Sequence, residues 1–253
     1  MTTNNNPVLY ANLTPLDRVL HKKLRLRTDV PVTARIAKQN SLFLAAVEFV
    51  EACKEFPIVF VRVGEAPADG ARPAVAPLAV MGVKPGQNLF VEGDKLTTNY
   101  VPAYVRRYPF AMARLDQQAA DQLAVCFDAD WEGFNETEGH ELFTEAGEPT
   151  EFLLGAKTFL ENFENEVERT RQICDKLMEL DLLEDMRFDA TLGNGEKLAV
   201  DGFLAVNEKK LGELPDATVI ELYRNGLMSL IEMHRISMSN MNRLAMLNAN
   251  AAA

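Results

Sequence analysis

The residues best suited to chemistry lie together near the middle of the chain. Three of its five tyrosines fall within nine residues there, beside two adjacent arginines. A guanidinium pairs bidentately with a carboxylate or phosphate, and a tyrosine ring stacks on a ligand while its hydroxyl makes a hydrogen bond. A binding site for a carboxylate, phosphate or sugar would use Tyr100, Tyr104, Arg106, Arg107 and Tyr108. The alternative is a structural corner in which the rings cover a sheet and the arginines pair with acids such as Asp94. The structural interpretation is the stronger, since no second group in the sequence converges on this segment.

An acidic stretch, residues 129–148, follows and carries Trp131. Oxygen and nitrogen ligands for a divalent metal are available at Asp128, Asp130, Glu132, Glu136, Glu138, His140 and Glu141. Their spacing matches neither a calcium loop nor the two-histidine, one-carboxylate set of non-haem iron. We therefore predict a solvated acidic loop with no metal, and expect Trp131 to be a hydrophobic anchor rather than an exposed contact.

The C-terminal region is rich in methionine. Half of the chain's methionines lie there, at Met228, Met233, Met238, Met241 and Met246, together with His234. A soft-metal site or an adaptable peptide-binding face would use such residues. The apolar positions recur at helical spacing, however, which favours packing in a core or in a homo-oligomer. A protein or peptide partner on this face is the remaining alternative.

Sequence signatures of catalysis are absent. The three histidines form no HExxH motif, no serine lies in GxSxG, and no glycine pattern matches GxGxxG or GxxxxGK. The cysteines, Cys53, Cys126 and Cys174, are odd in number and widely spaced, so we expect buried free thiols rather than disulfides or zinc ligands. The sequence thus favours a non-catalytic protein without a cofactor.

Charge and hydropathy limit the partners. A net charge of −11 and a pI near 4.9 argue against nucleic acid or an anionic membrane as the main partner. A local basic patch remains at Arg18, Lys22, Lys23, Arg25 and Arg27. No apolar run approaches the roughly 18 residues of a membrane-spanning helix. Because the first residues lack the pattern of a secretory signal, we expect a cytoplasmic protein, or one that reaches the cell surface by a signal-independent route.

Strand patterns dominate the first half of the chain and helical patterns the second, which predicts an α+β fold. A mixed or antiparallel sheet from the N-terminal half is expected to be packed by a long helix, a β-hairpin and C-terminal helices. The expected strands are 21–27, 57–63, 75–83, 88–91, 110–115 and 123–128, with a hairpin from 186–192 to 197–200. The expected helices are 47–56, 102–105 (one turn), 151–180 capped by Thr150, 208–214, 216–224 and 227–247. We expect one domain over 1–253, with a flexible arm at 1–16 and a frayed tail at 248–253.

The order of several short motifs resembles the SapC family of bacterial proteins. These motifs are Phe56-Pro57-Ile58-Val59-Phe60, Leu78 to Gly82, Asn88-Leu89-Phe90, Tyr100-Val101-Pro102, Arg106-Arg107-Tyr108-Pro109-Phe110, Glu141-Leu142-Phe143, Gly147-Glu148-Pro149-Thr150, Leu180-Asp181-Leu182-Leu183 and Asp201-Gly202-Phe203. The resemblance covers about residues 15–240 and implies an association with bacterial surface layers. It carries no established reaction or catalytic residues. The transporter permease of the same name is a different protein, because this chain has no membrane span.

These observations lead to one main functional hypothesis and one alternative. The main hypothesis is a non-catalytic binding or accessory protein, linked to surface-layer or envelope functions, that uses the Tyr/Arg segment as its contact. The alternative is a ligand-modifying enzyme whose site joins Arg106 or Arg107 to acids of the 128–141 loop.

Overall fold

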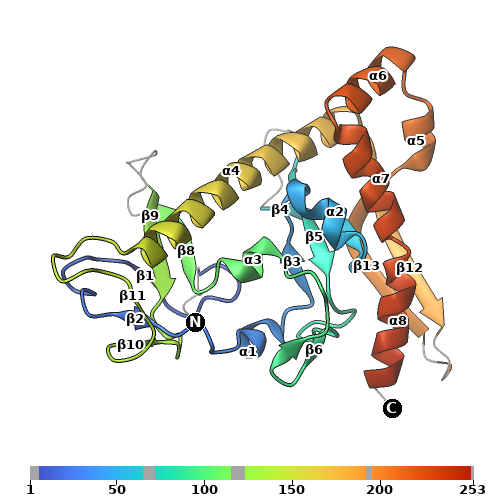
Figure 1. Cartoon of the computed structure of the whole chain (residues 1–253). Coiled ribbons are helices and arrows are strands. Elements are labelled where there is room, and N and C mark those ends of the chain that lie inside the picture. The colour runs from blue at the N-terminus through green and yellow to red at the C-terminus, as the bar shows by residue number, and fades with distance from the viewer. Residues whose placement is uncertain (1–5, 65–71, 115–122, 192–194, 196, 252–253) are drawn as a thin grey trace. The chain divides into compact units, whose positions relative to one another are not determined.

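The fold is α+β, as the order of the elements predicted (Figure 1). The structure is a computed structural model, and it describes all residues except 1–5, 65–71, 115–122, 192–194, 196 and 252–253. Its contacts divide the chain into two compact units. Unit 1 comprises Met1–Ile36, Gly93–Lys95 and Tyr104–Asn165, and unit 2 comprises Ala37–Glu92, Leu96–Ala103 and Glu166–Ala253. The expectation of a single domain stays a prediction.

Unit 1 contains two small sheets. The first has the order β1 (Leu13–Pro15), β9 (Leu123–Asp128), β8 (Phe110–Arg114), and the second has the order β10 (Phe134–Asn135), β2 (Arg25–Leu26), β11 (His140–Glu141). Both are antiparallel, and Phe110 on β8 pairs with Phe127 on β9. Unit 1 also contains the short helix α1 (Thr33–Ile36) and the first half of the long helix α4 (Glu151–Glu179). The predicted strands at 110–115 and 123–128 are therefore confirmed over their described residues.

The predicted flexible arm at 1–16 is wrong over much of its described part. Leu9 and Tyr10 are buried, and β1 pairs with β9 from Leu13 to Pro15. The Tyr10 hydroxyl donates a hydrogen bond of 2.6 Å to the Phe110 carbonyl. The predicted strand at 21–27 shrinks to the two residues of β2, because the chain before it forms turns. Short polar segments of this kind are fixed by tertiary pairing that the local pattern does not show.

Unit 2 is built on a five-stranded antiparallel sheet. Its order is β12 (Leu183–Thr191), β13 (Lys197–Val206), β4 (Ile58–Val63), β5 (Ala74–Val80), β3 (Ser41–Phe43). The predicted hairpin forms, and it extends the sheet through the pair Leu204 and Phe60 instead of packing on it. The predicted strand at 88–91 is wrong: only β6 (Val91–Glu92) forms there, as part of a two-stranded sheet with β7 (Lys95–Leu96).

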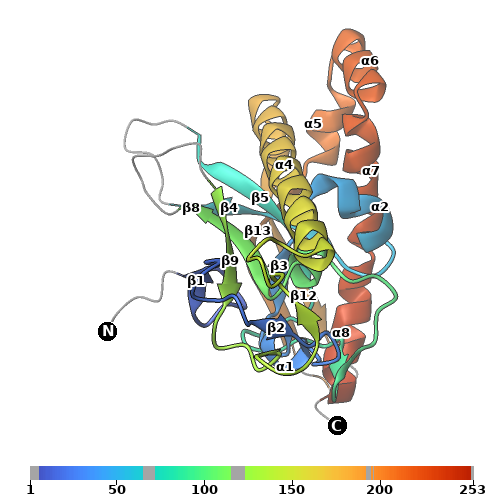
Figure 2. The ribbon, with the colours of Figure 1, turned by 60° about the vertical axis from the view of Figure 1, so that its left-hand side comes forward.

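Unit 2 also contains several helical segments besides the second part of α4. They are the 3₁₀ turn η1 (Ala46–Glu48), α2 (Phe49–Ala52), α5 (Glu208–Gly212), α6 (Asp216–Arg224), α7 (Leu227–Ser237) and α8 (Asn240–Ala251). Helix α7 lies against β4 and β13, and α8 lies against β12 (Figures 1 and 2). The prediction of one final helix is wrong, because the chain breaks between Ser237 and Asn240. The frayed tail is also wrong over its first residues, since α8 continues to Ala251 and buries Asn248.

The apolar stripe of the Met-rich region packs as core, although Met241 is the only one of its five methionines that is buried and Met246 is 69% exposed. Ile231, His234 and Met241 are each 1% exposed, which confirms the packing interpretation for this face. Association between copies through this region stays a prediction. No helix in the described part of the chain is both long enough and apolar enough to cross a bilayer.

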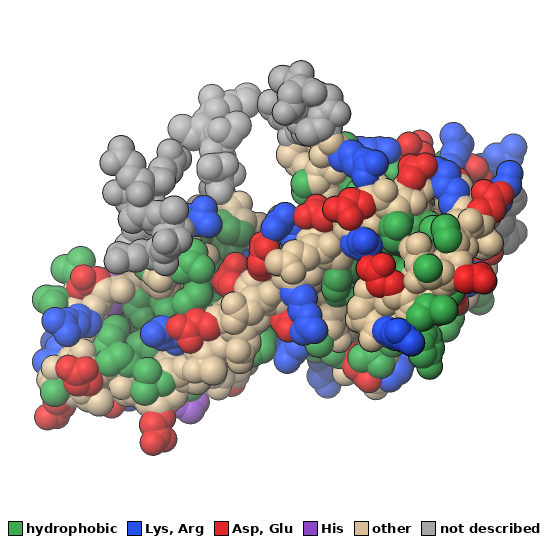
Figure 3. Space-filling model, turned by 90° about the horizontal axis from the view of Figure 1, so that it is seen from above, with side chains coloured by type: hydrophobic (Ala, Val, Ile, Leu, Met, Phe, Trp, Pro, Cys, Tyr) green, Lys and Arg blue, Asp and Glu red, His purple; other side chains and the backbone are tan. Residues whose placement is uncertain are grey.

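Helix α4 forms where the 3.6-residue periodicity predicted it. Thr150 caps its start, with its Oγ1 accepting a hydrogen bond of 3.4 Å from the Leu153 amide. The buried side includes Leu160, Phe163 and Cys174. The outer side carries acidic and basic side chains in ion pairs at helical spacing, such as Arg171 with Glu168 (2.7 Å) (Figure 3). These pairs suit a solvent-facing helix surface.

Candidate functional site

The arginine pair follows a single helical turn, α3 (Ala103–Arg106). The chain then passes Tyr108 and the cis peptide bond before Pro109, and enters β8 at Phe110. This path sends the two arginines into different environments: Arg107 is buried at 8% exposure, whereas Arg106 is exposed. The two arginines of the predicted site therefore do not share one environment.

Arg107 lies in an aromatic cage. Its guanidinium carbon is 4.1 Å from the ring centroid of Tyr104, 4.6 Å from that of Phe163 and 5.7 Å from that of Tyr10. Its Nη1 is 3.6 Å from Oε1 of Glu164, whose pKa is raised by burial and lowered in part by Arg107. The Nε of Arg107 is buried and makes no hydrogen bond. The sequence predicted pairing with local acids such as Asp94; the acid beside Arg107 is Glu164, from α4.

Tyr104 and Tyr108 both face the interior of unit 1. The Tyr104 hydroxyl donates to the Val8 carbonyl at 3.1 Å. The Tyr108 hydroxyl donates to Oδ2 of Asp128 at 2.7 Å, and burial first, then Asp128, raises the pKa of Tyr108. Its ring also packs edge-on against Trp131, with centroids 5.0 Å apart. Trp131 is 5% exposed, which confirms its predicted role as a hydrophobic anchor.

Asp128 is the polar centre behind these rings. Its carboxylate is fully buried and accepts hydrogen bonds from the Asn12 amide (2.8 Å) and the Ala11 amide (3.2 Å). A guanidinium nitrogen of Arg35 lies 3.6 Å from Oδ2. A buried carboxylate needs such donors to offset its lost hydration. Asp128 therefore ties the N-terminal segment to β9 and does not form part of a solvated loop.

Tyr100 belongs to unit 2, apart from the other four predicted site residues. Its hydroxyl donates to Oε1 of Glu48 at 2.7 Å. The same carboxylate accepts from the Ala103 amide (2.7 Å) and the Ala45 amide (2.9 Å). Glu48 is 4% exposed, so this is a buried structural network. Tyr100 supports the fold of unit 2 in this arrangement.

A cleft of about 300 Å³ opens in unit 1 beside the Tyr/Arg segment. We call it the unit 1 cleft. Its lining residues are Leu26, Arg27, Thr28, Val30, Val32, Arg106, Arg107, Tyr108, Pro109, Phe110, Trp131, Phe152, Ala156 and Phe159. Three of the predicted site residues, Arg106, Arg107 and Tyr108, border this one cavity, and their role in binding stays a prediction. The guanidinium of Arg106 lies 5.4 Å from the ring centroid of Phe159.

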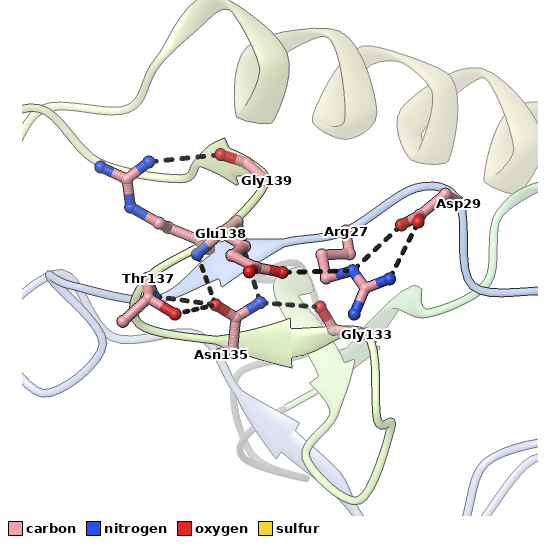
Figure 4. Close-up of polar contacts among 8 residues, drawn as sticks. Arg27, Asp29, Gly133, Asn135, Thr137, Glu138 and Gly139 are labelled. Atoms are coloured by element: carbon pink, nitrogen blue, oxygen red, sulfur yellow. Dashed lines mark hydrogen bonds and ion pairs between the residues drawn. The ribbon is translucent and has the colours of Figure 1, made fainter.

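Arg27, which directly follows β2, brings a third guanidinium to the cleft. It makes hydrogen bonds of 3.1 and 2.9 Å to the carboxylate of Asp29, and lies 3.8 Å from Glu138 (Figure 4). The hydrogen bonds that Arg27 donates to Asp29 raise the pKa of Arg27. The sequence placed Arg27 in a basic patch and gave no sign that it would meet the Tyr/Arg segment.

The acidic stretch is folded around β2 rather than left as an open loop. Oδ1 of Asn135 accepts from the Thr137 amide (2.8 Å) and the Glu138 amide (2.6 Å), which closes the turn between β10 and β11 (Figure 4). The Glu141 carboxylate pairs with Arg25. The acids of this stretch thus neutralise arginines of the neighbouring strand. No three His, Cys, Asp or Glu residues in the described ranges are grouped so as to hold a metal ion.

The 128–141 region does contribute to the cleft, although through an unexpected residue. The alternative hypothesis joined an arginine to a carboxylate of this region. Of the region's residues, the cleft is lined by Trp131, and the adjoining aromatic wall comes from Phe152 and Phe159 on α4. Helical spacing marked this side of α4 as apolar, but it did not indicate that part of the apolar stripe would border a cavity.

Comparison with known proteins agrees with the motif order. A family model described as SapC matches residues 16–244, nearly the whole chain. The chain belongs to the SapC family. No curated protein and no solved structure matches it. The residues matched by the SapC model include every lining residue of the unit 1 cleft.

Proposed function

We propose that this SapC-family chain is a non-catalytic binding protein whose unit 1 cleft holds a small organic anion with an apolar body. One observation carries the proposal: every charged residue that lines the cleft is an arginine, namely Arg27, Arg106 and Arg107. The whole chain has 37 acidic and 26 basic residues, so an all-basic lining differs from its average surface. Asp29 and Glu164, which pair with Arg27 and Arg107, lie outside the lining, so the charged groups that a bound ligand would meet are cationic.

The remaining lining defines the body of the ligand. The lining has aromatic side chains at Tyr108, Phe110, Trp131, Phe152 and Phe159, and aliphatic ones at Leu26, Val30, Val32, Pro109 and Ala156. A volume near 300 Å³ is at the small end for ligand sites, and such sites combine apolar walls with a few polar groups that fix orientation. The fitting ligand is a carboxylate on an aromatic or branched aliphatic group. A free carboxylic acid and the C-terminal residue of a peptide share this chemistry.

The enzyme alternative has weaker support. It requires an acid or base beside the bound ligand, and the lining offers aromatic rings and guanidinium groups in that place. Asp128 is the buried carboxylate closest in sequence to the lining residue Trp131, and it already accepts hydrogen bonds from the Tyr108 hydroxyl and two backbone amides. On the family resemblance we link the binding role to surface-layer or envelope functions, with the cytoplasm, or the cell surface by a signal-independent route, as the place of action.

A charge series of one ligand body tests the proposal. Binding of phenylacetate, phenylacetamide and benzylamine to the full chain is measured by calorimetry. The carboxylate should bind, and the amide and the amine should bind at least tenfold more weakly. Arg106→Gln should reduce phenylacetate binding about tenfold, because a charge-assisted hydrogen bond is lost.

The matched control is Arg169→Gln, an exposed arginine on α4 in unit 2 with a side chain 72% exposed. It removes the same charge, does not line the cleft, and should leave binding unchanged. The proposal is wrong if amide and acid bind equally, or if both arginine variants bind as the wild type does. A peptide ending in phenylalanine, compared with its C-terminal amide, then distinguishes the two ligand sources.

A further inference from the structure

The turn at residues 17–23, which we call the basic turn, presents apolar side chains to solvent. Leu20 is 81% exposed and Val19 is 75% exposed, the highest values for aliphatic side chains in the described ranges. They are adjacent in sequence and lie in unit 1, outside the lining of the cleft. Adjacent exposed aliphatic residues at the tip of a turn are a feature of surfaces that bind partners or membranes.

The turn is held in shape by its own hydrogen bonds. Oδ1 of Asp17 accepts from the Val19 amide (2.7 Å) and the Leu20 amide (2.8 Å), and these two bonds lower the pKa of Asp17. The Asp17 amide donates to Nδ1 of His21 at 2.9 Å, and the His21 ring packs edge-on against Phe127. The apolar tip is thus ordered before it binds, which avoids an entropic cost on binding.

Cations surround this tip. Arg18, Lys22 and Lys23 are exposed, and none of them makes an ion pair with a described residue. On one side, Lys22 and Lys23 share a surface hollow with acids that include Glu136. The same hollow is lined by Glu141 and Glu145, whereas Arg18, Val19 and Leu20 lie outside it.

We propose that the basic turn docks on an anionic lipid surface, with Val19 and Leu20 entering the headgroup region and the three cations pairing with lipid phosphates and carboxylates. The net charge of −11 argues against a membrane as the main partner, but charges farther away than about 8 Å are screened at physiological ionic strength. The side chains of the basic turn, rather than the net charge of the whole chain, then determine whether the turn contacts the lipid surface. Apolar side chains ringed by basic residues bind such surfaces by both burial and charge.

Sedimentation with vesicles tests this with the full chain. Vesicles of phosphatidylcholine containing about one-third phosphatidylserine should bind the protein, and pure phosphatidylcholine should bind it much less. Lys22→Ala/Lys23→Ala should reduce partitioning about 25-fold, at roughly fivefold for each cation. Val19→Ser/Leu20→Ser should reduce it at least tenfold.

Two control variants match these changes elsewhere. Ile220→Ser/Tyr223→Ser removes exposed apolar groups from α6, where the two side chains are 50% and 76% exposed. Lys157→Ala/Lys209→Ala removes the same charge from other exposed positions. Both should bind vesicles as the wild type does. The proposal fails if the wild type ignores anionic vesicles, or if the controls lose as much binding as the turn variants. If instead the turn variants lose self-association in ultracentrifugation while vesicle binding is absent, the tip is a contact between copies and the lipid proposal is wrong.

Discussion

His234 makes the stability of unit 2 depend on pH. Its ring is 1% exposed and packs against Phe60, with centroids 5.1 Å apart. Nε2 accepts a hydrogen bond from the Val206 amide (3.1 Å), which leaves Nδ1 to donate to the Ile58 carbonyl (2.7 Å). Burial lowers the pKa of His234 to about 4, although the bond to Ile58 acts in the opposite direction. The native fold therefore requires the neutral ring.

The sign and the size of the effect follow from linkage. The unfolded chain, with a histidine pKa near 6.5, binds a proton at a higher pH than the folded chain does. The contribution of the neutral ring is fully present above pH 6.5, falls as the pH drops toward 4, and then levels off. The difference of about 2.5 pH units corresponds to a maximum loss of about 3 kcal/mol, of which about 2 kcal/mol is lost by pH 5.

Urea unfolding at pH 7.5 and pH 5, followed by circular dichroism, measures this loss. The His234→Gln variant keeps one donor and one acceptor but cannot titrate. Its loss of stability between pH 7.5 and pH 5 should therefore be about 2 kcal/mol smaller than that of the wild type. His140→Gln, at an exposed position in unit 1, should retain the wild-type difference. Equal pH dependence in wild type and His234→Gln would refute the reasoning, as would an NMR titration of His234 centred near 6.5.

Three substitutions test the buried contacts and the tight turn. Asp128→Ala should lower the free energy of unfolding by about 3 kcal/mol or more, because it leaves several buried donors unpaired. Asp130→Ala, at an exposed position, should lower it by less than about 1 kcal/mol, and chemical denaturation measures both values. Glu48→Ala should cost about 2–4 kcal/mol for the same reason, and a melting temperature unchanged from wild type would contradict this. Gly139→Ala should cost about 1–3 kcal/mol, since its Cβ would lie 2.3 Å from the Leu26 carbonyl oxygen at a φ of +91°. Gly147→Ala, at a similar φ but in open space, should cost less, and equal losses would assign the effect to backbone strain alone.

The local sequence pattern was sufficient to predict a helix or strand wherever that element is long or strongly apolar. The periodicity of 151–180 predicted α4 to within one residue at its end, and Pro57 followed by β-branched residues predicted β4. The hairpin was found from its alternation and its glycine-containing turn. In these segments the local preference and the tertiary environment agree, so the sequence alone suffices.

Short elements were decided by distant partners. Leu13–Pro15 form a strand because β9 offers unpaired backbone groups and Asp128 accepts from the amides just before them. Their polar, proline-containing sequence has no strand pattern of its own. The final helix breaks where Ser237 turns inward and its hydroxyl accepts from the Ile58 amide at 2.9 Å. No window of local sequence contains that contact, since the two residues are 179 positions apart.

By itself the sequence determined the α+β class, the SapC family, the long helix and the segment on which the candidate site is built. The tertiary structure decided what the members of that segment do. Arg107 is buried among aromatic rings, and the hydroxyl of Tyr108 donates a hydrogen bond to Asp128. The hydroxyl of Tyr100 donates a hydrogen bond to Glu48 in unit 2, and Arg27 lines the same cleft as Arg106. The physical reason is that residue type specifies which interactions a side chain can make. Only the fold decides which partner meets it and how much water remains around it.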